Sequence, residues 1–375
     1  MRALIGAALS CTFVGRVLVG ALKEHMREVS ASSISRLGAI AVAALLAGVS
    51  LLVSSACATD GVATPVDPTL VPPAPASPDA GASRPDAADA VVPPGADASA
   101  DAAIDAGPKP PFACKADATF PGTFPVAEAS AAAEVALRAG VRELLVVSDS
   151  GRSGAAMAIE IPSGAQRALT FPLDPAANDD LEGIAWRSGK LYTLTSSGAV
   201  RRFTPDGTGG LTRDQDAYAV GAVPYACADL TAVNCGKNYE GLCLRAPGSA
   251  SPCAGYAASK AEGKLYCLTV DASGHLVAST TTPPLSLGLP ADQLSDCAFG
   301  AAGGPAADVL VVTTNVFGLS RTYRVDESNG ALTKLPIASL LNVEAAAIDR
   351  DGALYVFDDN NGATSSAAKV TCVGW

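Results

Sequence analysis

The chain has 375 residues, of which 49% are hydrophobic and 17% charged, and its formal net charge is −11 at pH 7. Residues 113–375 alone carry 19 Lys and Arg against 27 Asp and Glu, a balance of 19 − 27 = −8. This excess of acid argues against nucleic acid as a partner, because binding to phosphates requires clustered Lys and Arg. The negative charge is compatible with cations or uncharged molecules as partners.

The N-terminal part of the chain is typical of a secretion signal. Residues 37–56 form an uninterrupted run of apolar and small side chains, preceded by Arg36 and followed directly by Cys57. The end of this run, Val53-Ser54-Ser55-Ala56-Cys57, resembles a bacterial lipobox, in which the cysteine becomes the lipidated first residue. We therefore expect an exported lipoprotein of the bacterial cell envelope, anchored to a membrane by a lipid on Cys57. An uncleaved transmembrane anchor is the alternative.

The residues before this run add a second apolar stretch, broken by Arg16, to a signal that is already complete. Met26 would open a charged region of ordinary length ahead of the run. We therefore predict that the physiological start is Met26, which would leave Cys11 and His25 outside the protein. Residues 1–56 are thus interpreted as a signal and precursor segment.

Residues 57–112 are expected to form a disordered linker. Positions 58–112 hold 12 Pro, 15 Ala and 8 Asp, and Phe112 is their only aromatic residue. Such a composition cannot bury enough apolar surface to offset the entropy cost of ordering the chain. The expected role is that of a spacer between a membrane and a folded domain at 113–375.

One pattern returns five times in that domain: a carboxylate, a small or apolar run, a turn, and a β-rich run. The clearest copy joins residues 180–186, Asp-Leu-Glu-Gly-Ile-Ala-Trp, to residues 191–198, Leu-Tyr-Thr-Leu-Thr-Ser-Ser-Gly. In the third copy we expect residues 238–244 to pair with residues 265–269. The repeated acidic residues, 54, 58, 56 and 48 positions apart, are Glu128, Glu182, Glu240, Asp296 and Glu344.

A period of ~40–50 residues with strand patterning is the signature of propeller blades. In the first copy, further β-like runs at 155–161 and 167–171 complete a unit of four strands. We therefore predict an all-β fold, a single β-propeller of five four-stranded blades, with a sixth, degenerate blade as the alternative. The last copy lacks a strand, and residues 113–120 could supply it and close the ring.

The cysteines predict four disulfides. Without Cys11 and Cys57 the chain has eight cysteines, an even number in an exported domain. Closure of the ring would place Cys114 beside Cys372, and Cys227 can close a short loop with Cys235. The remaining four allow three pairings that spacing does not settle: Cys243, Cys253, Cys267 and Cys297. A zinc site is disfavoured because no Cys-x-x-Cys occurs.

If the first strand of each blade faces the propeller axis, the five repeated carboxylates converge at one mouth. Hairpin pairing would add Asp149 beside Glu128, and Asp271 beside Glu240. Ligands that are all oxygens favour Ca²⁺ over zinc. The alternatives are that each carboxylate accepts backbone N–H bonds from the next blade, or that one acts as an acid or base. Repetition in every blade favours the structural alternative, because a catalytic group needs one copy only.

The sequence gives little support to other catalytic mechanisms. His275 is the only histidine after residue 25, so a Ser-His-Asp apparatus could rest on that residue alone. The sequence contains no Gly-x-Ser-x-Gly element and no Gly-x-x-x-x-Gly-Lys loop.

The start Asp/Asn-x-Glu-Gly-Ile/Leu, followed by a Leu-Tyr-x-Leu-Thr/Ser-x-x-Gly strand, resembles bacterial phytase-like propeller proteins, the group called "esterase-like activity of phytase", over about residues 120–375. The resemblance implies calcium sites and hydrolysis of phosphate esters, for which Arg201, Arg202 and Arg213 are candidate phosphate ligands. Two functions are therefore expected. The first is a lipid-anchored binding module with an unknown protein or small-molecule ligand, and the second is a calcium-dependent hydrolase of esters or phosphoesters.

Overall fold

The chain is described by a computed structural model that covers residues 111–120, 122–221, 227, 229–316, 319–337, 342–360 and 364–375. The expected start at Met26, the signal, the lipid on Cys57 and the linker up to residue 110 lie outside these residues. Phe112, the last residue assigned to the linker, packs against Trp375, with 5.1 Å between the ring centres. Among the residues described, no helical segment has the length and apolar character needed to cross a bilayer.

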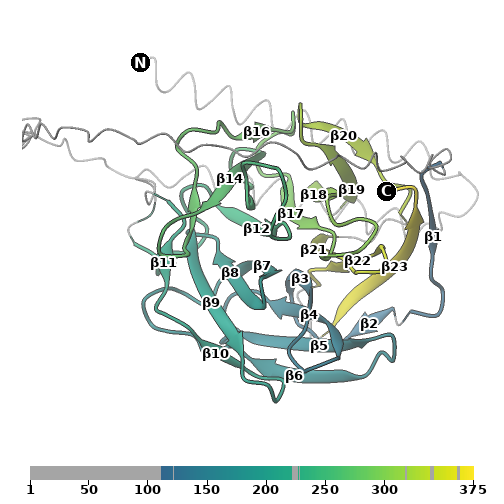
Figure 1. Cartoon of the computed structure of the whole chain (residues 1–375), viewed down its shortest axis with the longest axis horizontal. Helices are drawn as coiled ribbons and strands as arrows, with labels where there is room; N and C mark the ends of the chain where they lie inside the picture. The colour runs from purple at the N-terminus through teal and green to yellow at the C-terminus, as the bar shows by residue number, and fades with distance from the viewer. Residues whose placement is uncertain are drawn as a thin grey trace, which may run out of the picture. The chain divides into compact units, whose positions relative to one another are not determined.

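Five antiparallel sheets are arranged in a ring around a common axis (Figure 1). The first blade consists of β3 (Ala129–Val135), β4 (Arg142–Ser148), β5 (Ala155–Ile161) and β6 (Gln166–Thr170). The second consists of β7 (Leu181–Arg187), β8 (Lys190–Thr195), β9 (Ala199–Pro205), β10 (Leu211–Arg213) and the short β11 (Tyr218–Ala219). The third consists of β12 (Tyr239–Leu244), β13 (Gly255–Ser259), β14 (Lys264–Val270), β15 (Leu276–Ala278) and the short β16 (Leu285–Ser286). The fourth consists of β17 (Leu294–Phe299), β18 (Leu310–Val316), β19 (Leu319–Asp326) and β20 (Ala331–Lys334).

The fifth blade is completed by the N-terminal end of the domain. Its strands β21 (Val343–Ile348), β22 (Ala353–Asp358) and β23 (Ser365–Val373) are joined by β1 (Ala113–Ala116), and β2 (Thr123–Phe124) also pairs with β23. The predicted all-β propeller of five four-stranded blades, closed by an N-terminal strand, is confirmed. The described residues contain no sixth blade.

The third blade differs from the expected pairing. Its second strand is β13 (Gly255–Ser259), and residues 265–269 belong to its third strand, β14. The segment Gly-Tyr-Ala-Ala-Ser has few of the β-branched residues that mark strands in a sequence. Because β13 intervenes, Asp271 follows the far end of β14, and the expected proximity of Asp271 to Glu240 was wrong.

The apolar core is divided among the spaces between blades. Five clusters of buried side chains each join two neighbouring blades, and one of them packs Leu145 and Val147 of β4 against Ile184, Leu191 and Phe203 of the second blade. A four-stranded sheet cannot bury both faces alone, so each blade depends on its neighbours. The innermost strands are thereby held close together around the axis.

Four disulfides form, as predicted. Cys114 is joined to Cys372 between paired residues of β1 and β23, and Cys227 is joined to Cys235 in a short loop. The remaining four cysteines, whose pairing the sequence left open, form the disulfides Cys243–Cys297 and Cys253–Cys267. Four disulfides indicate a protein that folds in an oxidising compartment outside the cytoplasm.

Candidate functional site

All five inner strands carry a β-bulge close to their start. The pairing register shifts across a single extra residue in each blade, and these residues are Ser130, Glu182, Glu240, Ser295 and Glu344. A bulge redirects the side chain of the extra residue. The structure therefore aligns three glutamates with two serines. It corrects the alignment taken from the sequence, since Glu128 lies two residues before its bulge and Asp296 one residue after.

The two serines at the bulges connect blades. The hydroxyl of Ser130 donates a hydrogen bond to the carbonyl oxygen of Leu181 in the second blade, and that of Ser295 donates to Val343 in the fifth at 2.9 Å. Each acceptor is the residue just before the bulge of the next blade. In the first and fourth blades the bulged position thus serves the fold.

Asp296 also has a structural role. It is 2% exposed, and its carboxylate accepts hydrogen bonds from the backbone N–H groups of Cys297 and of Ala346 in the next blade, both at 2.7 Å. Burial raises the pKa of Asp296 well above its usual value, against the effect of these two hydrogen bonds. The alternative of a carboxylate that pins neighbouring blades together therefore applies to this residue.

Glu128 lies outside the group of bulged glutamates. Its backbone is in the left-handed region, with φ of 52°, and its carboxylate is paired with Arg152 at 2.7 Å between Oε2 and Nη2. Its carbonyl oxygen accepts a hydrogen bond from the N–H of Asp149 at 2.9 Å, which brings Asp149 to the same end of the blade.

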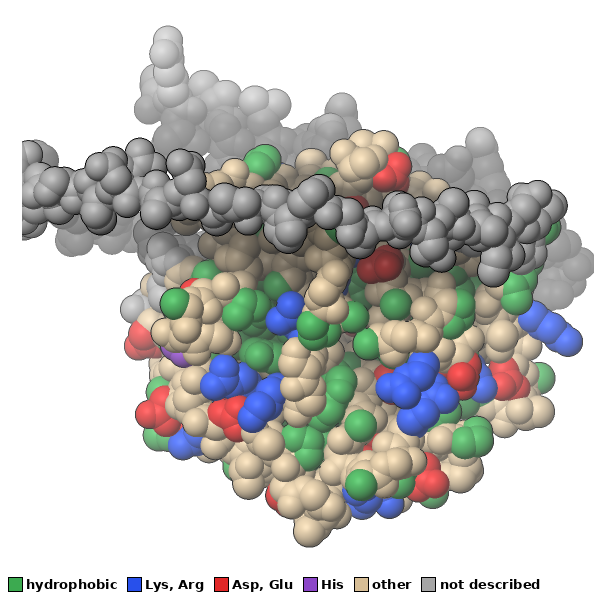
Figure 2. Space-filling view, viewed as in Figure 1, with side chains coloured by type: hydrophobic (Ala, Val, Ile, Leu, Met, Phe, Trp, Pro, Cys, Tyr) green, Lys and Arg blue, Asp and Glu red, His purple; other side chains and the backbone are tan. Residues whose placement is uncertain are grey.

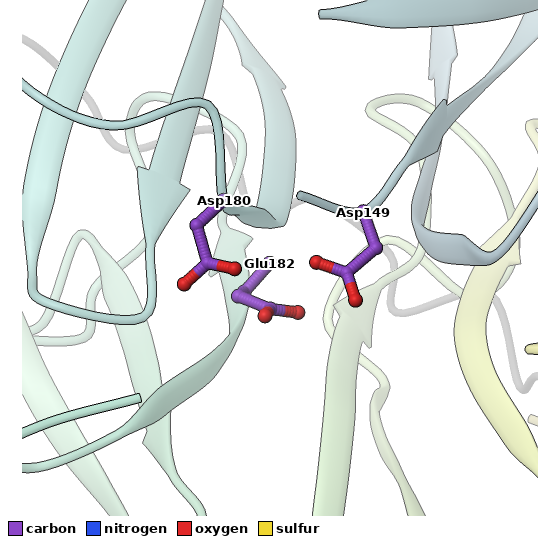
Figure 3. A group of neighbouring side chains, drawn as sticks. All are labelled: Asp149, Asp180 and Glu182. Carbon is purple, nitrogen blue, oxygen red and sulfur yellow. The ribbon is translucent and has the colours of Figure 1, made fainter. Parts of the chain in front are cut away.

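Three carboxylates from two blades converge beside the first two inner strands. Asp149 follows β4, Asp180 directly precedes β7, and Glu182 is the bulged residue of β7 (Figure 3). Figure 3 shows their side chains pointing toward one another, and one ligand oxygen from each lies within 4.8 Å of the others. Among the residues described, these form the one group of three or more potential metal ligands within that distance.

Burial and the neighbouring charges disfavour the charged forms of Asp180 and Glu182. Burial, together with the charge of Asp149, raises the pKa of Asp180 to about 6, although the Ser196 hydroxyl opposes the shift. Burial raises the pKa of Glu182 well above its usual value, and the charges of Glu240 and Asp149 add to the effect. Carboxylates in this state gain from a bound cation, which would neutralise them without protonation.

A lysine interacts with the three bulged glutamates. Lys260 directly follows β13, and its Nζ lies 3.1 Å from Oε1 of Glu240. Burial, and to a lesser extent the charge of Glu344, raises the pKa of Glu240 to about 8, although Lys260 opposes the shift. Burial also raises the pKa of Glu344. We call the group Asp149, Asp180, Glu182, Glu240, Lys260 and Glu344 the acidic mouth.

Asp180 and Lys260 were not among the site residues expected from the sequence. A signal for Asp180 was present, because it stands two residues before Glu182, where the third and fifth copies have Asn238 and Asn342. Lys260 was missed because β13 was not recognised. In four blades a residue at the end of the second strand donates its N–H to the carbonyl oxygen two positions before the bulge. This residue is Asp149, Asn315 or Asp359 in the first, fourth and fifth blades, but lysine in the third.

The arginines expected as phosphate ligands lie on β9 and β10, the third and fourth strands of the second blade. Arg201 is fully buried and paired with Asp174 at 3.0 Å. Arg202 is paired with Asp214 at 3.0 Å, and Arg213 with Asp216 at 3.3 Å. All three are engaged in ion pairs of that blade, and a role as phosphate ligands stays a prediction.

His275 lies in the turn before β15, where its ring stacks on Tyr218 with 4.1 Å between the ring centres. No serine of the described residues forms a hydrogen bond with its side chain. The ring of His275 therefore packs against Tyr218, and among the described residues it is not paired with a serine nucleophile.

Neither a protein-family profile nor a curated protein matches this sequence. Among solved structures, it is similar to a putative 6-phosphogluconolactonase from Bacteroides fragilis, with 16% identity and a TM-score of 0.32, over 58% of this chain and 63% of the other. It is also similar to a glucose dehydrogenase, with 13% identity and a TM-score of 0.36, over 66% and 99% of the two chains. The chain spans less than two thirds of the length of the first of these proteins. Likenesses this distant carry no argument about activity.

The fold and the site define a class: a disulfide-bonded, five-bladed propeller with carboxylates gathered at one end of its inner strands.

Proposed function

We propose that this protein is an exported binding module, held at the cell envelope by a lipid on Cys57, whose acidic mouth binds Ca²⁺. The observation that carries the proposal is the convergence of Asp149, Asp180 and Glu182 within 4.8 Å. Ca²⁺ takes 6–8 oxygen ligands, and three carboxylates supply up to six, with water to complete the shell. A bound cation would stabilise the charged form of Asp180, whose pKa is raised to about 6 by burial and by the charge of Asp149.

A resident calcium ion at this position would connect the first and second blades and leave the surrounding loops as the surface that meets a partner. On the visible part of the face in Figure 2, basic and acidic side chains are interspersed. Such a surface suits recognition of a protein or an uncharged molecule better than a polyanion.

The test is thermal unfolding of the oxidised full-length protein in EDTA and with added Ca²⁺. A ligand at ~1,000 times its dissociation constant stabilises the native state by ~4 kcal/mol, so we expect a shift of about 8–16 °C. Glu182→Gln should remove most of that shift. The matched control is Glu160→Gln, which removes the same charge from β5 and should keep it. An equal response of wild type and Glu182→Gln would refute a calcium site in the mouth.

The second candidate function is a calcium-dependent hydrolase of esters or phosphoesters. Lys260 favours it, because its ammonium lies beside the carboxylates and could hold an ester or phosphoryl oxygen. Hydrolysis of p-nitrophenyl phosphate or acetate that requires Ca²⁺ and is lost in Lys260→Met would support this function. A calcium response without hydrolysis would leave the binding module as the function.

A further inference from the structure

The opposite end of the inner strands holds a cavity. Its volume is about 300 Å³, and it is lined by the last residues of each inner strand and by the loop that follows, at 132–136, 184–189, 242–244, 246–247, 297–302, 347–348 and 350. The acidic mouth stands at the start of the same strands. Since each strand has six or seven residues, at ~3.3 Å per residue the two sites lie roughly 20 Å apart.

The inner strands give this cavity a wall that is largely apolar, and the ion-paired Glu134 and Arg142 also line it. Ile184, Leu242 and Ile348 are at most 3% exposed and line it together with several alanines. The bridge Cys243–Cys297 joins the third and fourth inner strands in the same wall. The short side chains of alanine leave the space that larger residues would fill. A concave apolar site of this size is suited to the body of a small organic ligand.

Two arginines at the rim have unused hydrogen-bonding capacity. The Nε of Arg187 donates to the carbonyl oxygen of Arg245 at 3.1 Å, but its two terminal amino groups have no partner within the described chain. The guanidinium of Arg350 likewise has no ion pair or hydrogen bond there. By contrast Arg142, which also lines the cavity, is paired with Glu134 at 2.9 Å. The rim therefore offers the two terminal amino groups of Arg187 and the guanidinium of Arg350 as donors, in a domain whose net charge is negative.

Trp186 completes the rim beside Arg187. It is partly buried and lines the cavity, and its indole can contact an apolar ligand at the edge of the site. Guanidinium groups bind carboxylates through two parallel hydrogen bonds. An anionic group at the rim with an apolar body inside would satisfy both parts of the site.

We propose that this cavity binds a compact apolar carboxylate, with its body between the ends of the inner strands and its carboxylate on Arg187 and Arg350. The chemical class is a medium-chain or aromatic monocarboxylate. The site is separate from the acidic mouth and does not depend on the function proposed for that mouth.

The test is isothermal titration of the oxidised full-length protein with octanoate and with 3-phenylpropionate, which separate aliphatic from aromatic bodies. Octanol is the uncharged counterpart of octanoate. We expect one of the two carboxylates to bind at one site, and octanol to bind at least tenfold more weakly than octanoate if the aliphatic body is preferred. Arg187→Gln and Arg350→Gln should each weaken carboxylate binding several-fold, and the double variant should reduce it to the level of the uncharged analogue.

Arg321→Gln is the matched control, because Arg321 is exposed on β19 and does not line the cavity. Ala246→Phe, in the loop after β12, should block the cavity and abolish binding while the protein still melts cooperatively. Failure of both carboxylates to bind at millimolar concentration would overturn the proposal. So would binding that is unchanged in Ala246→Phe or in the double arginine variant.

Discussion

The two ends of the inner strands differ in how their side chains meet. At the starts of the strands, five bulges bring polar side chains toward the axis, and three carboxylates lie within 4.8 Å of one another. At the ends, the same strands present alanines and large aliphatic residues around a cavity that arginines also line. The difference teaches that a propeller can place two chemically opposite sites on one set of strands, because bulges alter the direction of side chains at one end alone.

The largest effect expected without added calcium is a pH dependence that originates at the acidic mouth. The folded-state pKa of Glu240 is raised from 4.5 to about 8 and that of Asp180 from 3.8 to about 6. A raised carboxylate pKa means that the folded state binds protons more tightly than the unfolded state. The contribution of these two groups to the free energy of unfolding is therefore greatest below pH 4, and it declines as the pH rises to about 8.

In EDTA we therefore expect the melting temperature to fall by about 5–10 °C between pH 5 and pH 9. Saturating Ca²⁺ should reduce this fall, because the cation replaces the protons. Glu240→Gln should also flatten the profile. A constant melting temperature in EDTA over this range would show that the pKa values of these carboxylates are not raised in the folded state.

The next effect concerns the one lysine of the mouth. Lys260→Met removes the partner of Glu240, and since Lys260 is 27% exposed we expect a loss of about 2 kcal/mol at pH 9, below that of a fully buried pair. At pH 5 Glu240 is protonated and the loss should nearly vanish. Urea unfolding at both pH values measures the difference. Lys334→Met on the outer strand β20 is the control and should be neutral at both.

The smallest expected effect is a difference in unfolding free energy between a variant of a bulged serine and a variant of a bulged glutamate. Ser295→Ala removes hydrogen bonds to Val343 and Thr313 and should cost about 1 kcal/mol at any pH. Glu344→Gln removes a repelled charge and can keep the hydrogen bond from Asn315, so it should stabilise the protein at pH 8. Both are measured by urea unfolding. Destabilisation by Glu344→Gln would contradict the repulsion inferred at the mouth.

Much of the fold could be predicted because its signals are local. Each repeated hairpin carries its own pattern of apolar runs and turns, and the missing strand of the last blade pointed to the N-terminal segment that became β1. The even set of cysteines predicted four bridges in the same way.

The site was harder to predict because its residues come together through register and packing. A bulge shifts the register by one residue, so sequence spacing alone aligned Glu128 and Asp296 with the three bulged glutamates. The repeated glycines after the glutamates also have a reason that spacing does not show. A Cβ on Gly183 would lie 2.4 Å from the backbone nitrogen of Leu242, so the inner strands approach too closely there for any other residue. The cavity was invisible in the sequence, since its walls come from five separated segments.

The bridge Cys114–Cys372 has a mechanical consequence. Cys114 is the second residue of β1, which closes the ring. It is covalently joined to β23, the strand of the fifth blade that pairs with β1. Any tension applied through the chain before residue 113 reaches this bond before it reaches the remaining hydrogen bonds of β1. The load therefore passes through a covalent bond into β23, and the propeller resists being opened from the end at which an anchored protein would be pulled.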